Sequence, residues 1–447
     1  MRQLLSLLVC LSMIFTLACA GPANDQQDAG IKSEGSIETA PEKNGHAKIV
    51  PAAERMELYL PLLRNKRVAV FANHTSMVGA TNLVDTLVKS GIKVTVIFGP
   101  EHGFRGTADA GEKVGNYTDE QTGVPVISLY GSKRKPSRED LRDVDVMLFD
   151  IQDVGTRFYT YISSLEEYME AALENNKPLI ILDRPNPNGF YVDGPVLDTN
   201  FRSFVGMQPV PIVYGLTIGE YAWMLVGEKW LQKGLAEKAL DAPANDSALA
   251  GPATSDSVVQ IGKKGWLTIV KCAGYDHNSK YELPVRPSPN LPDMQSIYLY
   301  PSTCLFEGTV LSEGRGTDKP FQVFGHPLLP PNFYSFTPRS IPGATNPKFK
   351  DQVCYGWDLS GTTEEVLTRV DNRVQLKWLI EAYRLFPQKD SFFLRNGGFF
   401  NKLAGNDVLI KQIRERVSEG DIRKSWEPAL NTYKGIRKKY LLYKDFD

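Results

Sequence analysis

The sequence is poor in the residues and motifs that mark several common classes of protein. It has five cysteines and five histidines among 447 residues, without the C-x-x-C spacing of a typical zinc site. The formal net charge is -1, so the chain has no excess of basic residues of the kind that nucleic-acid binding requires. There is no G-x-G-x-x-G after the first expected strand, and no Walker or G-x-S-x-G motif, which argues against a bound dinucleotide, nucleotide hydrolysis and a serine esterase. We therefore expect no nucleic-acid partner, no metal and no cofactor.

Long apolar runs are also scarce, apart from Leu4 to Leu17 near the N-terminus. This run is too short for a comfortable membrane span, so residues 1–20 are interpreted as a signal peptide. Ala18-Cys19-Ala20 fits a signal-peptidase site, whereas Leu17-Ala18-Cys19 resembles an imperfect lipoprotein box in which Cys19 is lipidated. We favour lipidation because residues 21–50 are polar and predict a disordered tether. The expected location is the bacterial cell envelope, periplasmic or at the outer membrane, with membrane contact only through the lipid.

Three cysteines, Cys272, Cys304 and Cys354, remain after the N-terminal segment. An exported protein meets an oxidising compartment, but an odd number allows at most one internal disulfide. A Cys304–Cys354 bridge and buried free thiols both stay open at this point.

Strand-like and helix-like segments alternate along the chain. Apolar runs predict strands over residues 67–72, 93–98, 125–130, 144–149 and 179–182. Helical spacing predicts helices over residues 82–90, 138–144, 159–174, 217–234, 364–386, 407–419 and 421–443. This alternation is typical of a parallel sheet. We therefore expect an α/β fold, with a Rossmann-like catalytic domain over residues 51–240, an insertion over 241–257, and a second, smaller α+β C-terminal domain over 258–447.

Polar groups follow four of the expected strands. They are Asn73 and His74, Glu101 and His102, Asp150 and Asp153, and Asp183. Right-handed crossovers place the ends of parallel strands at one edge of the sheet, where ligands bind in open α/β folds. The sequence therefore predicts a polar site at this edge.

Several motifs then carry a family resemblance. They are Phe71-Ala72-Asn73-His74-Thr75, Gly99-Pro100-Glu101-His102-Gly103-Phe104-Arg105-Gly106, Asp150-Ile151-Gln152-Asp153-Val154-Gly155-Thr156-Arg157, Asp183-Arg184-Pro185-Asn186-Pro187, Pro287-Ser288-Pro289-Asn290-Leu291-Pro292 and Glu313-Gly314-Arg315-Gly316-Thr317. In this order they resemble the NamZ family of bacterial exo-β-N-acetylmuramidases. The resemblance implies an active site in a cleft between the two domains. It also implies release of N-acetylmuramic acid from the non-reducing end of peptidoglycan fragments, with peptidoglycan-derived saccharides as partners in cell-wall turnover.

Glycoside hydrolysis usually needs two carboxyl groups. Glu101 is the first candidate for the acid, because it follows a buried strand, and His102 is placed to orient it or bind a hydroxyl. For the second group, Asp153 and Asp150 rank ahead of Glu313 and Asp183. The 2-acetamido group of the sugar is an alternative nucleophile, so substrate assistance, a covalent intermediate and inversion all stay open.

Muramic acid also carries a lactyl carboxylate, which a guanidinium can bind in bidentate fashion. Arg157, Arg105 and Arg315 are the candidates, and Tyr159 is a candidate for stacking on the sugar. The resemblance adds further candidates for substrate binding, namely Asn73, His74, Asp183, Asn186, Asn290 and Glu313.

Other classes of function are weighed against this one. A non-catalytic, lipid-anchored protein that binds peptidoglycan or sugars would use the same cleft, but would have no need of Glu101 beside His102. An esterase or amidase would need a nucleophile elbow, which is absent. A metal site from His74, His102 and Asp153 lacks a ligand spacing. The sequence therefore predicts an exo-acting glycoside hydrolase.

Overall fold

The computed structural model describes residues 48–106, 115–240, 256–262 and 265–446, and these residues belong to one compact unit. The predicted signal peptide, Cys19 and most of the predicted tether and insertion lie outside the described residues. The tether was expected to reach residue 50, yet Val50 already exchanges backbone hydrogen bonds of 2.9 Å with Ala273. Residues 48–50, which were expected to belong to the tether, are therefore part of the described fold.

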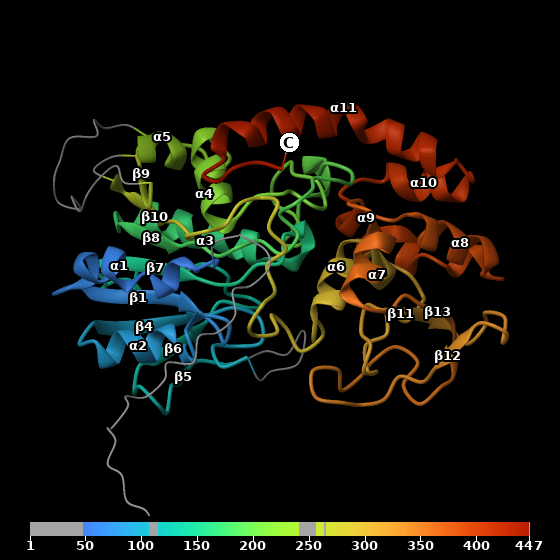
Figure 1. Ribbon diagram of the computed structural model, residues 1–447, viewed down its shortest axis with the longest axis horizontal. Helices are drawn as coiled ribbons and strands as arrows, with labels where there is room; N and C mark the ends of the chain where they lie inside the picture. Colours follow the sequence, from blue (N-terminus) through green and yellow to red (C-terminus); the bar gives the residue numbers. More distant parts are fainter. Residues whose placement is uncertain (1–47, 107–114, 241–255, 263–264, 447) are drawn as a thin grey trace, which may run out of the picture. The chain divides into compact units, whose positions relative to one another are not determined.

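An eight-stranded, mostly parallel sheet forms the larger part of the fold (Figure 1). Its strands, in spatial order, are β5 (Tyr117–Thr118), β6 (Pro125–Ser128), β4 (Lys93–Gly99), β1 (Arg67–Ala72), β7 (Val146–Asp150), β8 (Leu179–Leu182), β10 (Leu267–Val270) and β9 (Val258–Ile261). The six inner strands are parallel, and β5 and β9 pair antiparallel at the two edges. The predicted α/β class and parallel sheet are confirmed.

Helices cover both faces of the large sheet, and successive side chains of β1 pack into two different hydrophobic cores, one on each face. Val68 and Val70 pack in a core with α1 (Met56–Leu63) and α2 (Leu83–Lys89). Ala69 and Phe71 lie on the other face, in a core with residues of three helices, α3 (Tyr161–Glu174), α4 (Ile218–Gly227) and α5 (Leu235–Leu240). Both faces are buried, as a parallel sheet requires.

The smaller part carries a three-stranded antiparallel sheet, in the order β11 (Val323–His326), β13 (Cys354–Asp358) and β12 (Tyr334–Phe336). A hairpin of β2 (Met77–Val78) and β3 (Thr81–Asn82) follows β1 in the larger part. The remaining helices are α6 (Met294–Thr303), α7 (Thr363–Val370), α8 (Lys377–Leu385), α9 (Gly398–Ala404), α10 (Val408–Arg414) and α11 (Glu419–Arg437). The figure shows α11, in red, running back above the helices of the larger part (Figure 1).

Two hydrogen-bonded contacts explain the course of α11. Arg423 near its start pairs with Asp193 at 2.7 Å, and the Tyr433 hydroxyl near its end donates to the carbonyl of Tyr214 at 2.7 Å. The C-terminal helix is therefore anchored along its length to the segment that follows β8.

Several boundaries differ from the sequence-based expectation. The segment after residue 258 was expected in the second domain, but β9 and β10 extend the large sheet by pairing with β8. The helix expected over 138–144 is a series of turns, and the helix expected over 364–386 is divided into α7 and α8. Asp371 and Asn372 cause that division, because both have a φ of 50° in the left-handed region and cannot continue a right-handed helix.

The three described cysteines are buried free thiols, so no Cys304–Cys354 bridge forms. Among the helices that the structure describes, none combines the length and apolar character needed to cross a membrane.

Candidate functional site

A pocket of about 340 Å³ lies where loops after the parallel strands meet the smaller part of the fold. Its lining residues are Glu101, His102, Tyr130, Arg134, Phe158, Tyr159, Thr160, Tyr161, Phe204, Val205, Ser288, Leu291, Tyr300, Glu307, Arg315, Phe321 and Phe399. The volume is in the range of small-molecule sites. The segments that follow β4, β6 and β7 supply one wall, but of the polar groups predicted to converge at strand ends only Glu101 and His102 line the pocket.

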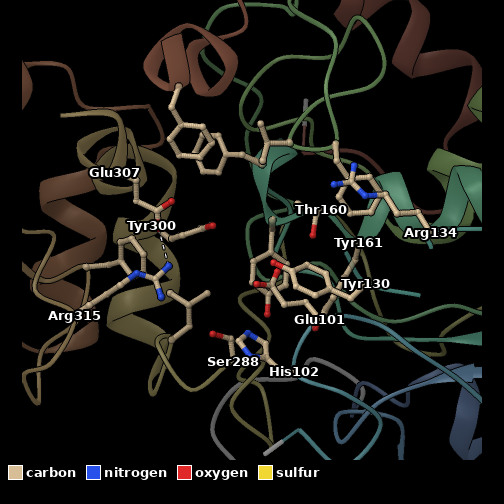
Figure 2. A pocket seen from close by; sticks show the side chains of 17 residues that line it. Glu101, His102, Tyr130, Arg134, Thr160, Tyr161, Ser288, Tyr300, Glu307 and Arg315 are labelled. Atoms are coloured by element: carbon tan, nitrogen blue, oxygen red, sulfur yellow. Dashed lines mark hydrogen bonds and ion pairs between the residues drawn. The ribbon is translucent and has the colours of Figure 1, made fainter. Parts of the chain in front are cut away.

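Glu101 and His102 come from the turn that ends β4. Gly99-Pro100 stops the strand, and His102 adopts a φ of 68°, in the left-handed region that few side chains occupy without compensation. The Tyr130 hydroxyl, from the end of β6, donates a hydrogen bond to the Glu101 carboxylate. Burial, and then the charge of Glu101, raises the pKa of both Tyr130 and Tyr161. Figure 2 shows Glu101 beside these two tyrosines.

The polar groups of Asn73 and Tyr159 form hydrogen bonds within the protein that hold this wall in place. The Asn73 side-chain amide donates to the Tyr161 hydroxyl at 2.9 Å, and its own oxygen accepts from the Thr75 backbone N–H and hydroxyl. The Tyr159 hydroxyl donates to the carbonyl of Pro287 at 2.8 Å, although its ring faces the pocket. These bonds fix the two tyrosine rings at the pocket wall.

The opposite wall carries an ion-pair network. Arg315 contacts Glu307 at 2.6 Å and Glu313 at 3.3 Å, and Lys348 contacts Glu313 at 3.0 Å. Burial opposes the charge of Glu313, but Lys348 and Arg315 hold the pKa of its carboxyl below the ordinary value. Figure 2 shows Arg315 and Glu307 across the pocket from Glu101. Of the predicted pair Glu313 and Arg315, only Arg315 lines the pocket.

Asp153 is buried behind the pocket residues. Its Oδ2 accepts from the Gly155 backbone N–H at 2.6 Å and from the Tyr214 hydroxyl. Its Oδ1 has no hydrogen-bond partner among the described residues. Burial raises the pKa of Asp153 to about 6, against the opposing effect of the hydrogen bond from Tyr214. The carboxyl does not line the pocket.

Asp150 and Asp183 are held by internal partners. Asp150 is the last residue of β7 and receives two hydrogen bonds from Arg184, at 2.5 and 2.8 Å. Asp183 accepts from the hydroxyls of Thr217 and Tyr443, each at 2.7 Å. Neither carboxylate lines the pocket, so the structure does not bring them together with Glu101.

Two of the three predicted arginines also lie elsewhere. Arg105 forms ion pairs with Asp85 at 3.0 Å and Asp119 at 2.8 Å. Arg157 is fully buried, and its guanidinium donates to backbone carbonyls, those of Pro195, Val210 and Leu403. Burial lowers the pKa of Arg157 to about 9. Both side chains therefore stabilise the fold, and neither lines the pocket.

The three remaining candidates donate to backbone carbonyls outside the lining. His74 donates from Nε2 to Arg286 at 2.9 Å, and burial lowers the pKa of its imidazole. The side-chain amides of Asn186 and Asn290 donate to Leu216 and Gly343, respectively, both at 2.8 Å. These bonds brace the loops around the site.

Sequence reasoning missed several pocket residues. They include Tyr130, Arg134, Thr160, Tyr300 and Glu307. Tyr130 lies inside the expected strand 125–130, whereas β6 ends at Ser128, so the misplaced strand end concealed it. Glu307 lies in the short 3-10 helix Cys304–Gly308, where no local pattern distinguishes it. Among the described residues, no group of three or more His, Cys, Asp or Glu side chains could hold a metal ion, and His74, His102 and Asp153 form no such cluster.

Known proteins match this chain over most of its length. The N-terminal model of exo-beta-N-acetylmuramidase NamZ matches residues 68–295, and the C-terminal model matches residues 298–443. The peptidoglycan beta-N-acetylmuramidase NamZ of Bacillus subtilis (strain 168) is 39% identical over 403 residues, which cover 86% of this chain and 89% of that protein.

Two solved structures, both of DUF1343 family proteins from Bacteroides fragilis, share the fold. One is 43% identical with a TM-score of 0.75, covering 89% of this chain and all of the other. The second is 27% identical with a TM-score of 0.70, covering 89% and 99%. Since the family models span nearly all the described residues, the chain belongs to the exo-β-N-acetylmuramidase NamZ family.

Proposed function

We propose that this chain is an exo-acting glycoside hydrolase that releases N-acetylmuramic acid from the non-reducing end of peptidoglycan fragments, with Glu101 as the proton donor. Membership of the family and the similarity to the Bacillus subtilis enzyme support the reaction class. The observation that carries the role of Glu101 is its position: it lines the pocket and accepts a hydrogen bond from Tyr130. Asp150 and Asp183, which were candidates for the second carboxyl group, are held by buried partners instead.

The chemistry assigned to Glu101 is protonation of the leaving-group oxygen. Cleavage of a glycosidic bond leaves an alkoxide unless a proton is delivered in the transition state, and a carboxyl group in reach of that oxygen supplies it. Tyr130 is a positioning residue, because its hydrogen bond fixes the rotamer of Glu101. Tyr159 and Tyr300 line the pocket and contribute aromatic surface, the kind of surface on which sugars pack.

Glu307 is the other carboxylate in the described lining, and Arg315 holds it at 2.6 Å. A carboxylate at this position suits stabilisation of developing positive charge on the sugar ring. Asp153 is placed behind the wall, where it holds the loop of Gly155. We therefore assign it to positioning, and rank Glu307 above it for the second carboxyl.

The test compares two β-linked N-acetylmuramic acid glycosides, one with a 2,4-dinitrophenyl and one with an unactivated sugar leaving group. A dinitrophenolate leaves without a proton, so loss of the acid affects it little, whereas a sugar alkoxide needs the proton. We expect Glu101→Gln to lose about 1,000-fold or more in kcat on the sugar and about tenfold or less on the aryl glycoside. Glu307→Gln is the matched control, for which we expect losses on both substrates.

Equal losses by Glu101→Gln on both glycosides would contradict its role as the acid. Failure of the folded wild-type protein to cleave either one would contradict the reaction class. The N-acetylglucosamine glycosides, which lack the lactyl group, complete the comparison and report on selectivity for the muramyl sugar.

We further propose that the protein is tethered to the cell envelope through lipidated Cys19. The support is the sequence Leu17-Ala18-Cys19 and the polar segment that follows it. Expression of the full chain with radiolabelled fatty acid tests this: the wild type should take up label and fractionate with membranes, whereas Cys19→Ser should do neither. Unlabelled wild-type protein in the soluble fraction would favour cleavage after Ala20 instead.

A further inference from the structure

Two arginines in the described pocket lining, Arg134 and Arg315, differ in how their charge is compensated. Arg315 is paired with Glu307 at 2.6 Å and lies 3.3 Å from Glu313. Its guanidinium also lies over the Phe321 ring, 5.0 Å from the centroid. Because two carboxylates share this cation, little positive charge is left there for an incoming anion.

Arg134 is in a different situation. Its side chain is exposed, and among the residues that the structure describes it forms no ion pair within 4 Å and no side-chain hydrogen bond. Its charge does act on Glu167, where it opposes the burial that raises the pKa of that carboxyl. The guanidinium carbon lies 4.0 Å from the centroid of Phe204, which also lines the pocket. Stacking on a ring face restrains the plane of a guanidinium and leaves its N–H donors, which lie in that plane, directed outward.

The place of Arg134 relative to Glu101 follows from the tyrosine between them. The charges of Glu101 and Arg134 both act on the pKa of Tyr130, the first raising it and the second lowering it. Figure 2 shows Arg134 on the same side of the pocket as Tyr130 and Tyr161, opposite Arg315. An anionic group of a sugar whose glycosidic oxygen faces Glu101 would therefore be within the field of Arg134.

We propose that Arg134 is the specificity-determining residue that binds the lactyl carboxylate of the muramyl sugar. This inference rests on the proposed function, since that function supplies the anionic substrate. N-acetylmuramic acid differs from N-acetylglucosamine by a lactyl ether that ends in a carboxylate. The pocket lining already carries Glu101 and Glu307, the second in an ion pair with Arg315, so a further carboxylate is favoured only beside a cation that forms no ion pair of its own. Arg134 is that cation, and it presents the planar fork that suits bidentate binding.

The experiment uses a pair of aryl β-glycosides of N-acetylmuramic acid, one with the free lactyl carboxylate and one with its methyl ester. The two differ by one charge and hardly in shape. For the wild type we expect kcat/KM on the acid to exceed that on the ester by about 10-fold to about 100-fold, the range for a charge-assisted hydrogen bond. In Arg134→Ala this preference disappears through a higher KM on the acid, while kcat on the acid and both constants on the ester stay close to wild type.

Two further variants make the result specific to this side chain. Arg134→Lys keeps the charge but not the planar fork, so we expect it to retain a reduced preference. Arg138→Ala removes an exposed arginine four residues away that does not line the pocket, and it should behave like the wild type. Because both positions are exposed, neither variant removes buried contacts.

A wild-type preference for the acid that survives in Arg134→Ala would overturn the proposal and shift carboxylate binding to Arg315. If the wild type cleaves neither glycoside, the proposed function fails, and calorimetric titration with free N-acetylmuramic acid and its methyl ester tests Arg134 by itself. Tighter binding of the acid by the wild type but not by Arg134→Ala would then support the assignment. Equal affinities of the wild type for acid and ester would overturn it.

Discussion

The hydroxyl of Tyr214 donates a hydrogen bond to Oδ2 of Asp153, although both side chains are buried and 61 positions separate them in the sequence. The pair joins the loop after β7 to the segment that precedes α4. The same carboxylate accepts the Gly155 backbone N–H, at a position where φ is 75° and glycine avoids strain. Asp153 thus organises the turn that leads to Tyr159 and Tyr161 in the pocket wall.

Asp153→Asn should change how stability depends on pH. Burial raises the pKa of Asp153 from 3.8 to about 6 in the folded protein. Between these values the folded protein holds a proton that the unfolded chain has released, so the free energy of unfolding falls as pH rises through this window. We expect a loss of up to about 3 kcal/mol from pH 4 to pH 7 that the variant lacks. Urea unfolding at four pH values measures it, and parallel curves for the two proteins would contradict it.

Arg184→Ala should be strongly destabilising. Arg184 is the buried partner of Asp150, and removing it leaves an uncompensated carboxylate in the core. The expected cost is about 3–5 kcal/mol in the free energy of unfolding at pH 7. Arg142→Ala is the matched control, because its pair with Glu139 is exposed and should cost less than about 1 kcal/mol. If thermal or urea unfolding shows similar losses of stability for the two variants, the buried carboxylate of Asp150 does not need Arg184 to compensate its charge.

Tyr130→Phe should affect turnover more than folding. The variant keeps the ring but loses the hydrogen bond to Glu101. A hydrogen bond contributes about 0.5–1.5 kcal/mol, so kcat on a sugar leaving group should fall by up to about tenfold, with KM little changed. The matched variant Tyr117→Phe alters an exposed tyrosine that does not line the pocket and should leave both constants unchanged. A rise in KM without a fall in kcat would mean that Tyr130 binds substrate instead of positioning Glu101.

Tyr443→Phe should weaken the attachment of the C-terminal segment. Its hydroxyl donates to Asp183 at 2.7 Å and accepts from the Cys272 backbone N–H at 2.9 Å, both in a buried setting. Loss of these bonds leaves buried polar groups unpaired, and we expect the free energy of unfolding to fall by about 1–3 kcal/mol. Chemical unfolding tests this, with Tyr334→Phe on the exposed part of β12 as the control. No difference between the two variants would contradict it.

The sheet and part of the pocket could be predicted from sequence because they depend on local patterns. Buried strands read as apolar runs, and Glu101 could be placed because it lies two residues beyond the end of β4. Asp150 followed the same pattern, yet it is the last residue within β7, paired in register with Ala72. Its side chain therefore belongs to the interior of the sheet. A shift of one or two residues at a strand end decides between a core ion pair and a site.

The two arginines show why other assignments failed. Arg157 looked available at the start of a helix, but its partners include the carbonyl of Leu403, 246 positions away. Arg134 carried no motif, and its exposure and stacking on Phe204 depend on a loop 70 positions further along. When distant segments decide whether a side chain is buried, the sequence around that residue carries no sign of it. Local patterns therefore cannot tell which arginine is available to bind a substrate.

The anchoring of the C-terminal segment has a consequence for the order in which the protein folds. Tyr433, Tyr443 and Lys444 bond to the segment before α4, to Asp183 and to His277, respectively, all within the larger part of the fold. These contacts are available only after residues 433–444 have left the ribosome, so the larger part cannot be completed before then. Expression of residues 48–295 alone would therefore yield an incomplete protein, even though a family model ends near that boundary. The two halves are consecutive in sequence but are stabilised together.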